Sequence, residues 1–76
     1  AACRLKYARN LTGFARTVFC KIHNMSSNTL AAWENGTTYF SENAAKKLSN
    51  FLYQDGIVVN YEWIMTGEGP EPFSLT

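Results

Sequence analysis

The chain has 76 residues, a formal net charge of +1 and a hydrophobic content of 46%. Its length fits one small domain with a single core, and so small a net charge does not by itself indicate a nucleic-acid-binding protein. These residues show no signal-peptide pattern and no apolar run near the ~18 residues that a membrane span needs, so we expect a soluble, cytoplasmic protein without membrane contacts.

Two short helices are predicted in the first part of the chain. The first, 3–11, has apolar residues at helical spacing and ends at Thr12-Gly13. The second, 15–23, ends before Asn24, a residue that tolerates the left-handed backbone of a sharp helix end. Its expected apolar stripe consists of Val18, Phe19 and Ile22.

A third short helix is predicted after Ser26, which can accept a hydrogen bond from a first-turn backbone N–H group. Because isolated helices of this length are marginal in water, Leu30 and Trp33 must dock on other elements. The opposite face has small side chains without bulk, namely Ser27, Asn28, Ala31 and Ala32. Such a face suits a helix that lies against another molecule.

A fourth helix is predicted from Ser41, which can cap it, to about Tyr53. Glu42 in its first turn is compatible with the helix dipole. The residues expected on its buried face are Ala44, Ala45, Leu48, Phe51 and Leu52. With the helices before and after it, this element predicts an all-α bundle of about five short helices.

The last part of the chain predicts one more short helix, 61–66, capped by Asn60. The stretch 57–59 is extended and can either pair as a strand or remain unpaired. The following residues are rich in Gly, Pro and Glu, a composition typical of linkers and frayed ends. We therefore assign 1–67 to the domain and 68–76 to a flexible tail or linker.

The segment 15–35 has the organisation of a helix-turn-helix, in which the second helix enters the major groove of DNA. Its spacing predicts that Phe19 and Ile22 face Leu30 and Trp33 on the next helix. Any helical hairpin packs its faces in this way, so a plain three-helix bundle fits the same pattern.

The motifs LKYARNLTG and VFCKIHNMSSNTLAAWENG, with the capped helix after them, resemble the phage repressor and Cro (XRE-type) helix-turn-helix family. This resemblance runs from Arg4 to about Leu52. The motif WIMTGEGPEP is similar to the end of DNA-binding modules that, in some phage-type repressors, precede a self-cleaving or dimerisation domain. The resemblance implies a lambda repressor-like fold, sequence-specific binding of double-stranded DNA, transcriptional regulation as a repressor, and a homodimer.

The resemblance also implies roles for individual residues. Those expected to read base edges are Ser27, Asn28, Ala31 and Ala32. Only Asn28 can form a bidentate contact, for which an adenine is the matching base. Those expected to contact phosphate are Arg9, Arg16, Ser26 and Asn35. An ion pair between Arg9 and Glu34 is expected to hold the first helix to the third.

Two departures from the family pattern are expected to weaken binding by a single module. Ala15 stands where a polar cap is usual, so the second helix begins less favourably. The loop after Gly36 lacks the Lys or Arg that often contacts the DNA backbone, which leaves fewer counterions to release. A homodimer on two half-sites, about 34–36 Å apart, is the usual way to restore affinity.

Basic residues are concentrated near the N-terminus, where the first 21 residues contain Arg4, Lys6, Arg9, Arg16 and Lys21. This distribution fits a phosphate-facing patch as well as it fits ordinary solvated helix faces.

Nothing in the sequence indicates catalysis, a cofactor or a small-molecule ligand. Cys3 and Cys20 are too few and too far apart for a zinc motif, and we expect both to be reduced thiols, Cys20 with a packing role. His23 is the single histidine, and we expect it to cap a helix or lie at the surface. We therefore predict that the protein is not an enzyme and holds no metal.

An alternative function is a protein-binding adaptor or antitoxin-like module that retains the fold. Its partner would contact the small-residue face of the third helix or a patch that contains Tyr61 and Trp63. The other interpretation of these two aromatic residues is that they pack the last helix onto the bundle, because they would otherwise remain exposed.

Overall fold

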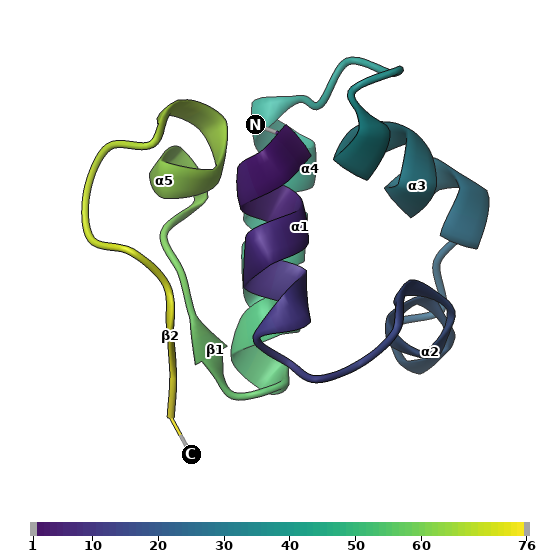
Figure 1. Cartoon of the computed structure of the whole chain (residues 1–76), viewed down its shortest axis with the longest axis horizontal. Coiled ribbons are helices and arrows are strands. Elements are labelled where there is room, and N and C mark those ends of the chain that lie inside the picture. Colours follow the sequence, from purple (N-terminus) through teal and green to yellow (C-terminus); the bar gives the residue numbers. More distant parts are fainter. Residues whose placement is uncertain (1, 76) are drawn as a thin grey trace.

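The computed structural model describes residues 2–75, most of which are helical (Figure 1). Within this range there are five helices: α1 (Ala2–Asn10), α2 (Arg16–Ile22), α3 (Ser27–Asn35), α4 (Glu42–Gln54) and α5 (Tyr61–Thr66). Two short strands, β1 (Ile57–Val58) and β2 (Phe73–Ser74), pair in antiparallel fashion. The prediction of a small, mainly helical domain is confirmed. No helix among these residues has both the length and the apolar character needed to cross a membrane.

Helix α1 lies at the centre of the fold, in front of α4 in Figure 1. Helix α3 packs against α1 and α2, whereas α5 packs against α1 and α4. The buried apolar residues that join these elements are Leu5, Ala8, Phe19, Cys20, Leu30, Phe40, Ala45, Leu48, Leu52, Ile57, Trp63 and Ile64. Because α1 contacts both α3 and α5, it separates two faces of the molecule.

The helix starts follow the predicted capping residues. Ser26, Ser41 and Asn60 each accept a hydrogen bond from a first-turn backbone N–H, at 3.4, 3.1 and 3.1 Å respectively. These bonds satisfy backbone donors that have no partner within the helix. Ala15 precedes α2 and forms no such bond, because an alanine side chain has no hydrogen-bond acceptor.

The turn between α2 and α3 depends on Asn24. Its φ of 53° is the one positive φ at a non-glycine position among the described residues. An Asn tolerates this conformation better than most residues do, as the sequence predicted. Directly after it, the Met25 N–H donates to the Cys20 carbonyl at 2.9 Å and so fixes the direction in which the chain leaves α2.

The buried face of α2 differs from the predicted one. Phe19 is fully buried, but Val18 is 45% exposed and Ile22 is 52% exposed, so the prediction that Ile22 faces α3 is wrong. The reason is that His23, a polar residue, occupies a buried position one turn after Phe19. Helix α2 is rotated to bury these two rings, and Val18 and Ile22 are thereby turned to the surface.

His23 is the C-cap residue of α2, one of the two roles expected of it, but its side chain does not lie at the surface. Its side chain is 3% exposed and lies between two aromatic rings, 4.6 Å from Phe19 and 4.4 Å from Phe51 by ring centroids. Its Nε2 is 2.7 Å from Oδ2 of Asp55, which follows the last residue of α4. This contact joins the ends of α2 and α4, and so holds the turn before α3 to the rest of the fold.

The segment expected as a tail, 68–76, packs against the domain over much of its described part. Ser74 pairs with Ile57 and Phe73 with Val58, and the Leu75 N–H donates to the Gly56 carbonyl at 2.8 Å. Pro72 is buried. The Gly and Pro content of this segment is typical of a linker, so the sequence did not predict the short strand β2 that pairs with β1.

We expect Asp55→Ala to lower the free energy of unfolding by about 1–3 kcal/mol, because it leaves the buried His23 ring without its hydrogen-bond partner. Urea unfolding followed by circular dichroism measures this change. Gln54→Ala, at the exposed neighbouring position, is the control and should change stability by less than about 0.5 kcal/mol. Equal effects of the two substitutions would contradict the role given to the His23–Asp55 contact.

Candidate nucleic-acid interface

A buried carboxylate connects α1 to α3. The Glu34 side chain has no exposed surface, and it accepts two hydrogen bonds from Arg9: Nε donates to Oε2 at 2.5 Å and Nη2 to Oε1 at 3.2 Å. Such a bidentate pair fixes the orientation of both side chains. The ion pair expected from the sequence is therefore present, and it sets the position of α3 on α1.

Arg9 also holds the connection between α1 and α2. Its Nη1 donates to the Phe14 carbonyl at 2.9 Å, so every nitrogen of the guanidinium is hydrogen-bonded. The residue is 6% exposed. Although a phosphate contact was also expected of Arg9, the observed bonds all serve the internal structure.

Arg16, the first residue of α2, approaches the same carboxylate from the surface. Its Nη1 lies 3.5 Å from Oε1 of Glu34, while 38% of its side chain remains exposed. One carboxylate thus lies between two guanidinium groups, Arg9 and Arg16. The cluster carries a net positive charge, and the exposed part of it is the Arg16 guanidinium.

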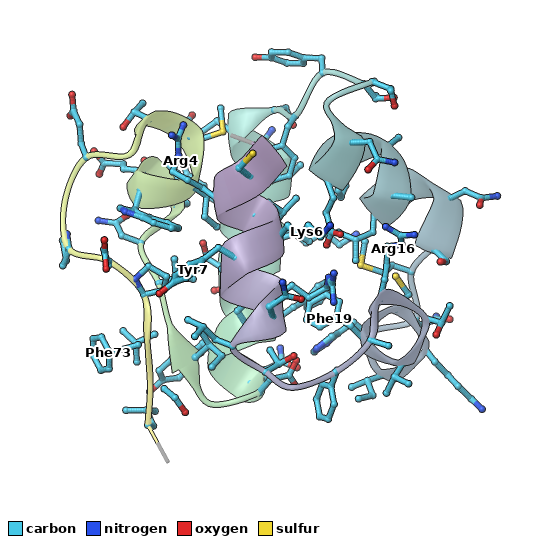
Figure 2. All side chains as sticks on the ribbon, in the orientation of Figure 1. Arg4, Lys6, Tyr7, Arg16, Phe19 and Phe73 are labelled. Atoms are coloured by element: carbon cyan, nitrogen blue, oxygen red, sulfur yellow. The ribbon has the colours of Figure 1, made fainter. Side chains whose placement is uncertain are left out.

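A hollow of about 570 Å³ lies where α1 ends and α2 begins. It is lined by Lys6, Arg9, Asn10, Gly13, Phe14, Ala15 and Arg16. Lys6 extends from α1 on the side of α3 and Arg16 lies beside α3, as Figure 2 shows. A concave surface with these cations concentrates anions. Lys6 was expected only as one of the basic N-terminal residues and not as a phosphate contact, although its spacing from Arg9 and Asn10 places the three on one face of a helix.

The basic N-terminal segment is divided between two faces. Arg4 extends from the opposite side of α1 to Lys6 (Figure 2). Its Nε donates to the Ile64 carbonyl at 3.1 Å and its Nη2 to the Met65 carbonyl at 3.0 Å, at the C-terminal end of α5. Arg4 therefore stabilises α5 and does not belong to the basic hollow.

The outer face of α3 has the small side chains that the sequence predicted. Leu30 and Glu34 are buried one turn apart, so Asn28 and Ala32, each two residues from Leu30, lie on the outer side. Asn28 is exposed and Ala32 is half-buried, as are the other two predicted base-reading residues, Ser27 and Ala31. Thr29, which the prediction omitted, is exposed beside Asn28.

The ends of α3 hold the two remaining residues expected to contact phosphate. Ser26 precedes the helix, and its Oγ caps the Thr29 N–H. Asn35 is the last helical residue and is exposed. Beyond Gly36, the loop 37–41 is neutral and α4 begins with an acidic residue, so the loop that follows α3 adds no positive charge beside it.

Cys20 lies behind this surface and is 3% exposed. Burial raises the pKa of its thiol, and the negative charge of Glu34 adds to the effect. The protonated thiol donates to the Ser26 carbonyl, with a separation of 3.8 Å. Cys20 therefore packs the turn between α2 and α3. Among residues 2–75, no three His, Cys, Asp or Glu side chains form a group that could hold a metal.

Comparisons with known proteins do not assign a function, so a functional proposal must rest on the geometry described above. No family model, curated protein or solved structure matches the chain. The features that bear on function are therefore the exposed face of α3, the basic hollow, and the buried ion pair that joins them.

We expect Glu34→Ala to lower the free energy of unfolding by about 3–5 kcal/mol, because it leaves the buried Arg9 guanidinium without a counter-charge. Chemical denaturation measures this loss. Glu68→Ala is the control, since Glu68 is exposed and its carboxylate forms no ion pair with the described residues. A loss below about 1 kcal/mol for Glu34→Ala, within the range of ordinary surface substitutions, would contradict the central role of this pair.

We expect a maleimide reagent to label Cys3, which is exposed, much faster than Cys20 in the folded protein. The thiolate is the reactive form, and the raised pKa of Cys20 keeps its thiol protonated to higher pH than an unperturbed cysteine. Intact-mass measurement should show one addition at neutral pH and two in urea. Rapid double labelling under native conditions would contradict the burial of Cys20.

Proposed function

We propose that the protein binds double-stranded DNA in a sequence-specific manner and acts in the cytoplasm as a transcriptional repressor. In this proposal α2, the turn at 23–26 and α3 form a helix-turn-helix of the phage repressor and Cro type. The observation that carries the proposal is the outer, small-residue face of α3, on which Asn28 is exposed; it lies next to a basic hollow, and α3 is held by a buried ion pair. The mechanism is occupancy of a DNA site without a chemical step.

The dimensions of α3 support insertion into the major groove. Its nine residues make a helix of roughly 13 Å, and a major groove about 12 Å wide admits a helix whose outer side chains are short. Asn28 would donate to N7 and accept from N6 of an adenine. Ala31 and Ala32 would contact thymine methyl groups, and Ser27 would form a single hydrogen bond to a base edge.

The basic hollow supports contacts to the DNA backbone. Arg16 and Lys6 would bind phosphates on the α1–α2 side, because both line the basic hollow and Arg16 keeps part of its side chain exposed. Ser26 and Asn35 would add neutral hydrogen bonds at the two ends of α3. Arg9 would act indirectly, because it positions α3 and forms an ion pair with the same carboxylate as Arg16.

The adaptor alternative gains little support from Trp63, one of the two aromatic residues of its second expected surface. Trp63 is 8% exposed and packs against the Tyr7 ring, with 6.0 Å between the ring centroids. It therefore stabilises the bundle and offers little surface to a partner. The small-residue face of α3 is common to both interpretations, and the adjacent positive charge favours DNA.

Two substitutions separate base reading from phosphate binding. Selection from a random duplex pool should yield a preferred site for the wild-type protein. Asn28→Ala should reduce discrimination between this site and a scrambled duplex. Arg16→Ala should weaken binding to both duplexes, and it should make the slope of log K against log salt less negative by about 0.9.

Matched controls lie on α4, away from the proposed interface. Asn50→Ala should leave sequence preference unchanged, and Lys47→Ala, which removes one positive charge as Arg16→Ala does, should leave the salt slope unchanged. Fluorescence anisotropy over a series of salt concentrations measures these effects. No duplex binding even at low salt, or an equal effect of Lys47→Ala and Arg16→Ala, would overturn the proposal.

A further inference from the structure

A second hollow lies on the side of α1 that faces away from α3. It has a volume of about 380 Å³ and is lined by Cys3, Arg4, Tyr7, Trp63 and Glu71. Its walls therefore come from α1, α5 and the segment before β2. Arg4 and Tyr7 lie on the α5 side of α1 in Figure 2. This volume is at the lower end of the range of small-molecule sites, so it suits a ligand about the size of one free amino acid.

The apolar wall of this hollow consists of two aromatic rings in contact. The centroids of the Tyr7 and Trp63 rings are 6.0 Å apart, and the rings are tilted by 52°. Trp63 is 8% exposed and Tyr7 is 48% exposed, so the ring that a ligand can reach is mainly that of Tyr7. A third ring packed against aromatic rings gains more than its buried area alone gives. This wall therefore favours a ligand with an aromatic ring.

Arg4 presents a positive group at the hollow in a fixed orientation. Its Nε and Nη2 donate to the Ile64 and Met65 carbonyls, which leaves Nη1 without a hydrogen bond to residues 2–75. Gly67 keeps that nitrogen uncovered, because a Cβ atom at this position would lie 3.4 Å from Nη1. A guanidinium that is held in place and has free N–H donors is well suited to bind a carboxylate.

Glu71 supplies a negative group on the wall formed by the segment before β2. Its carboxylate forms no ion pair or hydrogen bond with the described residues, Arg4 included. The fold holds this wall in place, since β2 is hydrogen-bonded to β1 and the next residue, Pro72, is buried. The hollow thus combines a cation and an anion that do not pair with each other.

We propose that this hollow binds a free aromatic amino acid. The ligand carboxylate accepts hydrogen bonds from Nη1 of Arg4, the ligand ammonium group donates to the Glu71 carboxylate, and the ligand ring packs on Tyr7. A zwitterion satisfies both charged groups at once, because it fits between a cation and an anion that form no ion pair with each other. A ligand with one charge would leave one of these groups without a partner.

This inference goes beyond the proposed DNA-binding function and does not rest on it. The hollow and the outer face of α3 lie on different sides of α1, and the hollow shares no lining residue with the basic hollow. Ligand binding and duplex binding can therefore be measured separately, and the failure of one does not decide the other.

Three related compounds test which groups of the ligand are recognised. L-phenylalanine has both charges, phenethylamine lacks the carboxylate, and 3-phenylpropionate lacks the ammonium group. NMR titration of the intact chain to about 10 mM of each compound covers the millimolar dissociation constants expected for a ligand of about a dozen heavy atoms. L-phenylalanine should shift the resonances of Tyr7 and Trp63, and each analogue should bind at least about twofold more weakly.

Glu71→Gln tests the contact with the ammonium group. It should weaken L-phenylalanine binding about two- to fivefold, the range for an exposed ion pair, and it should not weaken binding of 3-phenylpropionate, which has no ammonium group. Glu68→Gln is the matched control, since Glu68 is exposed in the same segment but does not line the hollow.

Tyr7→Ala tests the aromatic wall. It should weaken binding of all three compounds, because each of them has the same ring. Tyr53→Ala removes an exposed ring on α4, away from the hollow, and should weaken none of them. Circular dichroism confirms that each variant is folded.

Cys3 gives a second measurement on the wild-type chain, because it is exposed and lines the hollow. L-phenylalanine should slow the labelling of Cys3 by a maleimide. Glycine at the same concentration, which has both charges but no ring, should slow it less.

The proposal is overturned if L-phenylalanine at about 10 mM shifts no resonance of Tyr7 or Trp63. It is also overturned if the three compounds bind equally well, or if Glu68→Gln weakens L-phenylalanine binding as much as Glu71→Gln does. Binding that Tyr53→Ala weakens and Tyr7→Ala does not would place the ligand elsewhere on the molecule.

Discussion

The buried Glu34 carboxylate is the group on which the arrangement of the functional surface depends. A carboxylate without exposed surface is costly unless it is paired, and here Arg9 supplies a bidentate partner while Arg16 approaches from the edge. These contacts fix α3 on α1 and place the start of α2 beside them. One interaction therefore determines both the register of α3 and the position of the exposed cation next to it.

Helix α1 divides the molecule into two faces with different chemistry. On one side, Lys6 belongs to the basic hollow beside α2; on the other, Arg4 caps α5 and Tyr7 packs against Trp63. Only two sequence positions separate Arg4 from Lys6, which in a helix is about half a turn. The N-terminal concentration of basic residues is thus not one patch, and a count of charges along the sequence cannot show this.

Local features were predictable from the sequence because they depend on nearby residues. Ser26, Ser41 and Asn60 cap helices as expected, and Asn24 adopts the left-handed turn.

The errors involve partners distant in sequence. The burial of His23 requires Asp55, 32 residues later, and it turns Ile22 to the surface. The pairing of Phe73 with Val58 likewise depends on an edge that forms only in the folded chain. The α3 face was predictable because it depends on residues close together in the sequence.

The low net charge of +1 limits how tightly a single copy could bind DNA in the proposed function. Few exposed cations lie beside α3, so one copy releases few counterions and gains little affinity that is independent of sequence. Its base contacts are also limited, because only Asn28 offers a bidentate hydrogen bond. Two copies held at a fixed spacing would turn the second contact with DNA into an intramolecular step, which would raise affinity without new charge. In the proposed function, a weakly charged reading surface therefore needs a second contact with DNA, and occupancy of the site would follow the concentration of the protein.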